Sequence, residues 1–270
     1  MKRILSRAAL TVSLLLPVYF AVSALGVKFG LWDWKLGLGT LIVTWGPRLL
    51  IGALVLAAIA LVTCLVRKPR VGAGAAVAAL LIPAAGLGYM QYVRDQNAGI
   101  PPIHDVATNV EDPPLFSEAL MRERQASGAN QVHPLTTPLS AIDAYRNPRF
   151  ADRHARTVGE LGREAYPNLR PVTVNATPDR LFAVLREEAQ DRGWTIVSEN
   201  PAAGTFEATA ETFWFGFKDD VSVRVRPASA AGQLQIDARS TSRVGLGDMG
   251  ANAARLRDLL ADITEQLQGG

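Results

Sequence analysis

The 270-residue sequence has one cysteine, three histidines and few aromatic residues, which make up 7% of the chain. A single cysteine excludes an intrachain disulfide framework and a zinc site built from cysteines. His104, His133 and His154 are spaced too widely to form a local metal-binding motif, and no G-x-S-x-G nucleophile elbow occurs. We therefore expect no metal and no cofactor, and no set of catalytic residues stands out.

Charge is distributed unevenly along the chain. Residues 1–95 contain ten Lys or Arg and two Asp, a net charge of +8, whereas residues 96–270 contain eighteen Lys or Arg and 23 Asp or Glu, a net charge of −5. A duplex-binding domain normally carries a basic surface that displaces counterions from the phosphates. The acidic balance of the polar part argues against a nucleic-acid partner.

Three apolar segments without a charged residue fill the first third, at residues 8–27, 49–66 and 71–93. A membrane-spanning helix needs about 20 apolar residues, within a range of about 17–25. We predict a membrane anchor over residues 1–95 with three spanning helices, and hence a lipid bilayer as partner. A cleaved signal peptide is the alternative for residues 8–27, but the apolar run is longer than the usual signal core.

Basic residues set the predicted orientation. Three lie within residues 2–7 and three more, Arg67 among them, within residues 67–70. The positive-inside rule places both groups in the cytoplasm. Three crossings then put residues 95–270 in the periplasm of a bacterium, with the anchor in its inner (cytoplasmic) membrane. The absence of cysteine from residues 95–270 fits an oxidising compartment.

Residues 96–171 are predicted to be a Pro-rich linker followed by an irregular region. Four prolines within residues 98–114 favour an extended chain. Residues 115–126 predict a short helix. Residues 127–171 contain several prolines and few periodic patterns, so we expect loops with a helix near 150–164.

Residues 172–268 are predicted to form an α+β domain. A short strand at 172–174 precedes a helix that Thr177 caps and Gly193 ends, and four segments with apolar residues at every second position follow. Leu256, Leu259, Leu260 and Ile263 then form one stripe of a final helix. The order β-α-β-β-β-β-α predicts an antiparallel sheet with two helices on one face.

Several runs of residues resemble the domain of unknown function family 1499. They are Pro-Ile-His-Asp-Val-Ala-Thr at 102–108, Glu-Asp-Pro-Pro at 111–114, Ala-Tyr-Pro at 165–167 and Asp-Ala-Arg-Ser-Thr-Ser-Arg-Val-Gly at 237–245, with Asp248, Gly250, Asn252 and Arg255 after them. The resemblance covers about residues 100–267, and three preceding helices fit one bacterial branch of the family. It implies no reaction. Some members have a cysteine in the middle region, where this chain has none, so no thiol chemistry transfers.

The run Gly-Leu-Gly-Asp-Met-Gly at 245–250 has the form G-x-G-x-x-G between a predicted strand and a helix. A dinucleotide site would need a parallel strand after that helix, which the meander does not provide. An anion site is the remaining functional interpretation, because amides at a helix start attract anions. Its candidate residues are Ser240, Ser242, Arg243, Gly245, Gly247, Gly250, Asn252 and Arg255. The structural alternative, which we favour, is a tight turn capped by Asp248, with the arginines paired to carboxylates.

Two further groups of residues have a structural and a functional interpretation. Arg224, Arg226 and Arg239 alternate on strands that also carry Glu207, Glu211 and Asp237. Ion pairs on a solvated sheet face are favoured over a ligand-binding face.

Five residues at 213–217, Phe-Trp-Phe-Gly-Phe, fall at a predicted turn. Trp214 and Phe215 are candidates for contact with the membrane or a partner protein. Packing against the irregular middle region is the favoured alternative.

These features predict a membrane-anchored periplasmic domain, for which we favour a non-catalytic binding, accessory or scaffold role in the cell envelope. Its partner is an envelope protein or an anionic or lipidic ligand. The alternative is a membrane-tethered hydrolase that uses His104 or Asp105 with an Arg-lined pocket. A buried pocket that joins His104 to Arg243 is the feature that favours the hydrolase.

Overall fold

The computed structural model describes residues 1–66 and 68–268. These fall into two compact units. The first, which we call the helical unit, comprises Met1–Ala98 together with Thr212–Gly216. The second, the sheet unit, comprises Gly99–Glu211 and the chain from Phe217 onward. Arg67, one of the basic residues that set the predicted orientation, lies outside the described residues.

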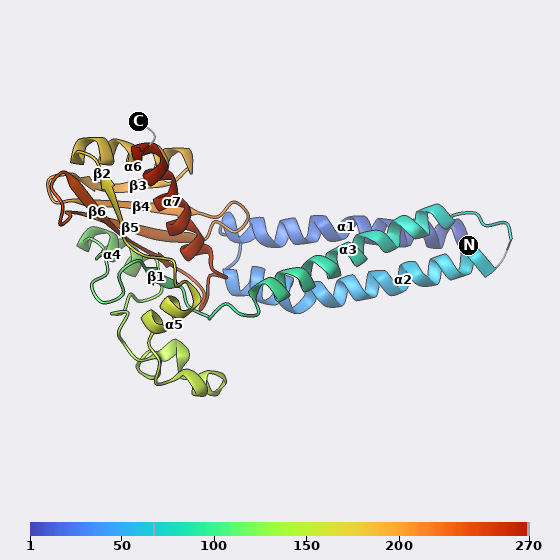
Figure 1. Cartoon of the computed structure of the whole chain (residues 1–270). Helices are drawn as coiled ribbons and strands as arrows, with labels where there is room; N and C mark the ends of the chain where they lie inside the picture. The colour runs from blue at the N-terminus through green and yellow to red at the C-terminus, as the bar shows by residue number, and fades with distance from the viewer. Residues whose placement is uncertain (67, 269–270) are drawn as a thin grey trace. The chain divides into compact units, whose positions relative to one another are not determined.

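The helical unit contains three long apolar helices, as the sequence predicts (Figure 1). They are α1 (Lys2–Lys28), α2 (Gly46–Val66) and α3 (Ala73–Asn97). A π-helix, η1 (Lys35–Trp45), runs directly into α2, so the helical run includes the apolar residues 36–46 as well as the predicted segment 49–66. Lys2–Lys28, Lys35–Val66 and Ala73–Asn97 are each long and apolar enough to cross a membrane.

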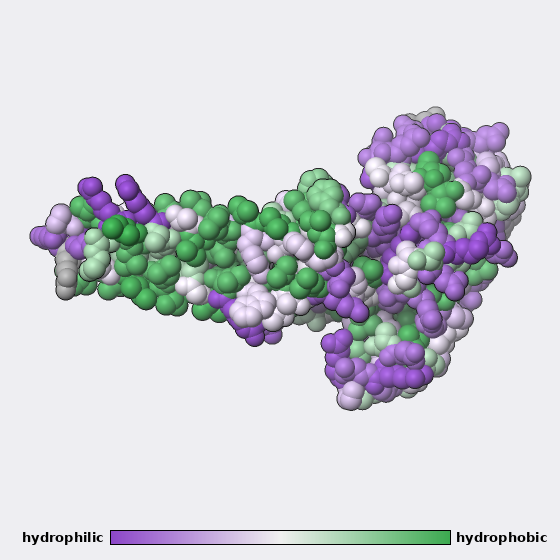
Figure 2. All heavy atoms as spheres, turned by 180° about the vertical axis from the view of Figure 1, so that it is seen from behind, coloured by the Kyte–Doolittle hydropathy of each residue, from purple (hydrophilic) through white to green (hydrophobic). Residues whose placement is uncertain are grey.

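Small side chains line the contacts among α1, α2 and α3. Ala9, Ala57, Ala60, Ala76 and Ala79 are fully buried there. Alanine lets helix backbones approach closely, which is how helices associate where lipid provides no hydrophobic driving force. The outward surface of these helices is largely hydrophobic in the view of Figure 2, with hydrophilic side chains gathered at the end that carries the N-terminus. This distribution suits a bilayer.

The sheet unit contains one antiparallel sheet of six strands. The strands are β1 (Asp105–Ala107), β2 (Val172–Asn175), β3 (Thr195–Asn200), β4 (Thr205–Glu211), β5 (Lys218–Pro227) and β6 (Gln233–Ser242). The spatial order is β1-β6-β5-β4-β3, and β2 also pairs with β6. The predicted order β-α-β-β-β-β-α is present from β2 onward. Strand β1 was not predicted, because three residues are too few to show a period of two.

One face of the sheet is apolar and is covered by α6 (Pro178–Asp191) and α7 (Ala251–Gln268) (Figure 1). Alternate residues of the strands point to this face, and helical stripes meet them. The buried core includes Phe182, Leu185, Phe206, Val221, Val223, Ile236, Leu256 and Ile263. Thr177 caps α6 as predicted, because its hydroxyl accepts a hydrogen bond from the Arg180 amide.

Residues 99–171 contain more packed structure than their sequence pattern suggests. They form β1, α4 (Glu118–Ala126), α5 (Val158–Ala165) and three short 3₁₀ turns, η2 (Leu139–Ala141), η3 (Asp143–Tyr145) and η4 (Pro148–Arg153). The expected helix near 150–164 is therefore divided between η4 and α5. Side chains of this segment, such as Ile103 and Tyr145, are buried in the same core as the sheet. The segment is thus part of the sheet unit.

The turn between β3 and β4 generates a testable prediction. Gly204 has φ +66°, and a Cβ built there would lie 2.2 Å from the Val225 carbonyl oxygen. Gly204→Ala should destabilise the sheet unit by more than the roughly 1–2 kcal/mol that a left-handed conformation alone costs. The measurement is denaturant unfolding of the full chain in detergent, followed by circular dichroism.

Gly232→Ala is the matched control. Gly232 also has a positive φ, +80°, but no atom lies within 4 Å of the position that a Cβ would take there. Gly232→Ala should lower the free energy of unfolding only by the cost of the left-handed backbone conformation. Equal destabilisation by the two variants would contradict the close approach of Gly204 to β5.

Candidate functional site

Strand β6 carries most of the predicted site residues, and its alternation divides them between the two faces of the sheet. Ser240 and Ser242 point to the face covered by α7, where they contact Asn252. Arg239 and Arg243 point to the opposite face. The structure therefore brings Ser240, Ser242, Asn252 and Arg255 together but places Arg243 in a different cluster.

The cluster under α7 is a closed hydrogen-bond network. Ser240 Oγ donates to Asn252 Oδ1 at 2.6 Å, and Asn252 Nδ2 donates to Ser242 Oγ at 2.9 Å and to the His104 carbonyl at 3.1 Å. Arg255 adds an ion pair to Asp219 at 2.6 Å. These contacts tie the first turns of α7 to β5, β6 and the segment before β1. Buried polar side chains that partner one another in this way specify how two elements dock.

The glycine loop before α7 is held by a carboxylate of the chain itself. Asp248 Oδ1 accepts from the Gly250 amide at 2.9 Å and Oδ2 accepts from the Asn252 amide at 2.8 Å. Gly245 and Gly250 have φ +85° and +82°, and Gly247 lies against the Pro102 backbone, where a Cβ would approach Cα to 3.0 Å. The glycines thus allow the turn, and Asp248 occupies two of the amides that an anion would use. Anion binding at this loop stays a prediction.

The opposite face carries a second cluster, centred on the fully buried Asp220. Arg243 holds this carboxylate with two hydrogen bonds, Nε to Oδ2 at 2.9 Å and Nη2 to Oδ1 at 2.8 Å. Arg124 of α4, also buried, donates Nη1 to the same carboxylate, and Thr209 donates at 2.7 Å. Glu123 of α4 pairs with Arg243 at 2.7 Å. Two arginines and two carboxylates from three elements therefore form one network.

Burial alone would raise the pKa of Asp220. The hydrogen bonds from Arg243 and Thr209, together with the charges of Arg243 and Arg124, outweigh burial and leave the pKa below its ordinary value. Asp220 is therefore ionised at neutral pH, and its charge is matched by the arginines. A carboxylate held in this way is a structural acceptor rather than a proton donor.

Arg239 forms a further buried pair on this face. Its Nε and Nη2 donate to the two oxygens of Asp105 at 2.9 and 2.6 Å, and Nη2 also donates to the His133 carbonyl at 3.1 Å. The Phe116 ring lies 5.4 Å from the Arg239 guanidinium carbon and 5.9 Å from that of Arg124. One aromatic ring thus contacts both buried cations.

The expectation that this sheet face is solvated is wrong where α4 and its flanking residues cover it. Arg239, Asp237 and Glu207 are all buried. Arg224 and Arg226 do pair with Asp237, at 3.3 and 2.7 Å, and both also pair with Asp112 from the segment before α4. Glu207 instead accepts the Ser117 amide at 2.6 Å. The cause of the error is that the covering segment is distant in sequence.

His104 and Asp105 do not form an acid–base pair. The His104 ring nitrogen Nδ1 lies 3.4 Å from the Leu246 carbonyl, and Asp105 is held by Arg239. Burial is the largest influence on the His104 pKa and lowers it from the ordinary value. The two residues are adjacent in sequence, but their side chains face different partners.

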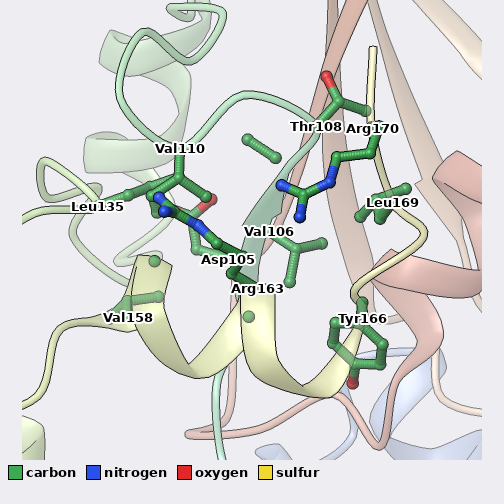
Figure 3. A pocket seen from close by; sticks show the side chains of 13 residues that line it. Asp105, Val106, Thr108, Val110, Leu135, Val158, Arg163, Tyr166, Leu169 and Arg170 are labelled. Atoms are coloured by element: carbon green, nitrogen blue, oxygen red, sulfur yellow. The ribbon is translucent and has the colours of Figure 1, made fainter. Parts of the chain in front are cut away.

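A small cavity lies between β1, α5 and the segment after α5 (Figure 3). Asp105, Val106, Arg163, Tyr166 and Arg170 are among its lining residues. Its volume of about 10 Å³ has room for about one water molecule. The described lining includes neither His104 nor Arg243, so this cavity does not join them.

A larger depression lies on the outside of α4. It is a groove of about 740 Å³ between α4 and residues 128–133. Its lining is Glu118, Met121, Arg122, Arg124, Gln125, Gly128, Ala129, Asn130, Gln131, Val132 and His133. We call it the α4 groove. No sequence pattern predicts this groove, since residues 127–171 show little periodicity. Over residues 1–66 and 68–268, no cluster of three or more His, Cys, Asp or Glu could hold a metal ion.

Residues 105–263 match a protein family described as "Protein of unknown function (DUF1499)". The match begins at the first residue of β1 and ends within α7. It thus takes in the whole sheet, both polar clusters and the α4 groove. Comparison with curated proteins finds no match.

The network around Asp220 generates a prediction about stability and pH. Asp220→Asn should cost about 3–5 kcal/mol of unfolding free energy at pH 7, because it leaves Arg124 and Arg243 buried without their shared carboxylate. Since the folded-state pKa of Asp220 lies below the unfolded value near 3.8, its stabilisation is complete above that pH and is lost as the pH falls through the folded-state pKa. The wild type should therefore lose stability below about pH 4 more steeply than the variant.

Asp112→Asn is the matched control, because Asp112 also pairs with two arginines but is 57% exposed. Its effect on unfolding should be much smaller. Both variants are followed by denaturant unfolding of the full chain in detergent between pH 3 and pH 7. An Asp220→Asn variant as stable as Asp112→Asn would show that the buried network does not hold the fold.

Proposed function

The chain belongs to the DUF1499 family, whose activity is unknown, and we propose that it is a non-catalytic, membrane-anchored binding domain of the bacterial cell envelope. Its helices cross the inner membrane, with the N-terminus in the cytoplasm and residues 95–270 in the periplasm. Its role is to bind or scaffold a partner, either an envelope protein or an anionic or lipidic ligand. The α4 groove is the recognition surface.

The hydrogen bonds of Arg124 that join the two walls of the α4 groove are the observation that carries this proposal. Arg124 lies in one wall, on α4, and its Nη2 donates to the Asn130 carbonyl of the other wall at 3.0 Å. Its Nη1 is held by Asp220 beneath the groove. A preformed concave surface loses little entropy on binding, and its volume is within the range of ligand sites, about 300–1,000 Å³.

The chemical character of the α4 groove suits binding of a chain segment or an amphiphilic ligand. Met121 and Val132 provide apolar surface, while Arg122, Gln125 and His133 add charged and polar groups. Arg122 forms an exposed contact with Glu118 at 3.4 Å, which a ligand can replace at small cost.

Arginines already bind the buried acidic residues, and this argues against the hydrolase alternative. Asp105 and Asp220 are each held by two or more charge-assisted hydrogen bonds from arginines. A general base needs a lone pair that can reach the substrate. Neither carboxylate faces the α4 groove with a free oxygen.

Anion binding at residues 245–250 remains part of this proposal, but fewer of the predicted residues take part in it. The anion must displace the Asp248 carboxylate from the Gly250 and Asn252 amides, and Arg255 is the nearby cation that can assist. Burial raises the pKa of Asp248. Protonation of Asp248 weakens its hold on these amides, so anions should bind better at acidic pH.

The orientation in the membrane draws support from the end of the helical unit that carries the N-terminus. Lys2 Nζ donates to the Pro69 carbonyl at 3.3 Å. The basic residues near the N-terminus therefore lie at the same end of the helices as Lys68 and Arg70 of the turn before α3. Lys28 and Lys35 lie toward the other end, and the positive-inside rule assigns the more basic end to the cytoplasm.

Fusions to alkaline phosphatase test this orientation, because the enzyme is active only in an oxidising compartment. Phosphatase fused after Asp95 should be active, and phosphatase fused at Lys68 should be inactive. Activity is measured in intact cells, with fusion protein levels as the control. The reverse pattern would place residues 95–270 in the cytoplasm and contradict the proposal.

Site-specific photocrosslinking tests the α4 groove as the recognition surface. A photoreactive amino acid at Gln125 should give a discrete adduct in native membranes, since this residue lines the groove. Gln190 is the matched control, because it is also a glutamine on an exposed helix surface, that of α6. Mass spectrometry of the adduct distinguishes a protein partner from a lipid.

The control decides how an adduct is interpreted. Val132→Glu, which places a charge in the apolar part of the groove, should abolish the Gln125 adduct without lowering the melting temperature. Equal adducts from positions 125 and 190, or an adduct that survives Val132→Glu, would contradict recognition by the groove.

A further inference from the structure

We propose that the β4–β5 loop, Thr212–Gly216, is a second contact with the bilayer, in which the rings of Phe213 and Trp214 enter the interfacial region. The proposal rests on α1, η1–α2 and α3 spanning a membrane, and it is independent of the α4 groove. The binding partner of this exposed aromatic turn is then a lipid surface.

Phe213 and Trp214 are unusually exposed for large aromatic side chains. They are 72% and 52% accessible, and their rings meet edge to face with centroids 5.2 Å apart. Phe215, the other predicted contact residue, is half-buried. Two adjacent apolar rings on one turn are typical of a surface that meets an apolar partner.

The backbone of the loop presents these rings on a fixed turn. The Gly216 amide donates to the Thr212 carbonyl at 3.0 Å, and Gly216 has φ +65°. A positive φ is readily available to glycine and closes the turn at little cost. Strands β4 and β5 pair up to Glu211 and Lys218, so the turn is anchored at both sides. Phe213 and Trp214 are thus held on a turn of defined geometry.

The loop belongs to the same compact unit as the apolar helices. Lys28, in the last turn of α1, donates Nζ to the Phe213 carbonyl at 2.8 Å, and this ammonium lies 5.0 Å from the centre of the Phe213 ring. A lysine at the end of an apolar span places its ammonium at the headgroup level. Phe213 therefore lies at the depth of the headgroups.

Other interfacial residues occur at the same end of the apolar helices. Trp32 and Trp34 lie between α1 and η1. Tryptophans and basic residues are enriched at the membrane–water boundary. The loop adds two rings to this aromatic group.

Charge favours lipid over a protein partner as the occupant. Residues 212–217 contain no charged side chain, whereas the basic residues Lys28 and Lys35 stand at the end of α1 and the start of η1. Lipid headgroups supply the phosphates that such basic residues bind, and the acyl boundary accepts the rings. A bilayer thus satisfies both features at once.

Spin-label accessibility of the full chain in phosphatidylcholine–phosphatidylglycerol nanodiscs tests the proposal. Trp214→Cys carries the label at the loop, and Ala230→Cys carries it in the β5–β6 turn, at the other end of strand β5. The one natural cysteine, Cys64, is fully buried, and wild-type protein treated in parallel measures any background labelling. Collision with oxygen, which partitions into lipid, is compared with collision with a water-soluble nickel chelate.

The ratio of oxygen to nickel accessibility should be several-fold higher at position 214 than at position 230. A Phe213→Cys variant, which retains Trp214, should give the same result and guards against a change in fold caused by either substitution. A ratio at 214 equal to that at 230 would show that the loop lies in water. Protection of the label from both reagents would show that protein covers the loop, and would equally overturn the proposal.

Discussion

The shared carboxylate of Asp220 is the constraint on which the polar half of the sheet unit depends. Arg243 binds this carboxylate from the end of β6, and Arg124 binds it from α4. The two oxygens of one buried carboxylate thus fix the C-terminal end of α4. Glu207 fixes the other end by accepting the Ser117 amide at the start of α4. A helix clamped at both ends leaves few alternative positions for the segment that covers this face. Buried ion pairs contribute less to net stability than their Coulomb attraction suggests, so we interpret this network as a device that specifies one docking geometry.

The sequence was sufficient for elements with a local signal. Apolar residues at every second position predict β4, β5 and β6, and helical stripes predict α6 and α7, because each pattern lies within a single element. Strand β1 has three residues and no such pattern. The sequence could not show that α4 covers the polar face either. Arg124 and Asp220 are 96 residues apart, and Asp105 and Arg239 are 134 residues apart. Alternating arginines and carboxylates look the same in a sequence whether water or α4 lies above them.

The alternation of strand β6 already shows that the predicted site residues cannot all face one ligand. The period of two that identifies β6 also requires Ser242 and Arg243 to face opposite sides, so one ligand could not contact both side chains from the same direction. The same rule separates Asp219 from Asp220, and the structure shows Asp219 paired with Arg255 of α7 and Asp220 with Arg243. The α4 groove had no sequence signal, because its walls are a short helix and an aperiodic segment brought together by Arg124.

The buried charges differ from the two exposed surfaces to which we assign binding. The acidic and basic side chains of the polar face are held by one another, which leaves them little freedom to bind a substrate or to exchange a proton with it. The α4 groove and the β4–β5 loop differ in that they meet the exterior, and both are fixed from beneath or from the side, by Asp220 and by the paired strands β4 and β5 respectively. Rigid support of an exposed surface lowers the entropy lost on association. The polar network therefore holds the α4 groove in place, and this support suits the binding or scaffold role that we propose for the domain.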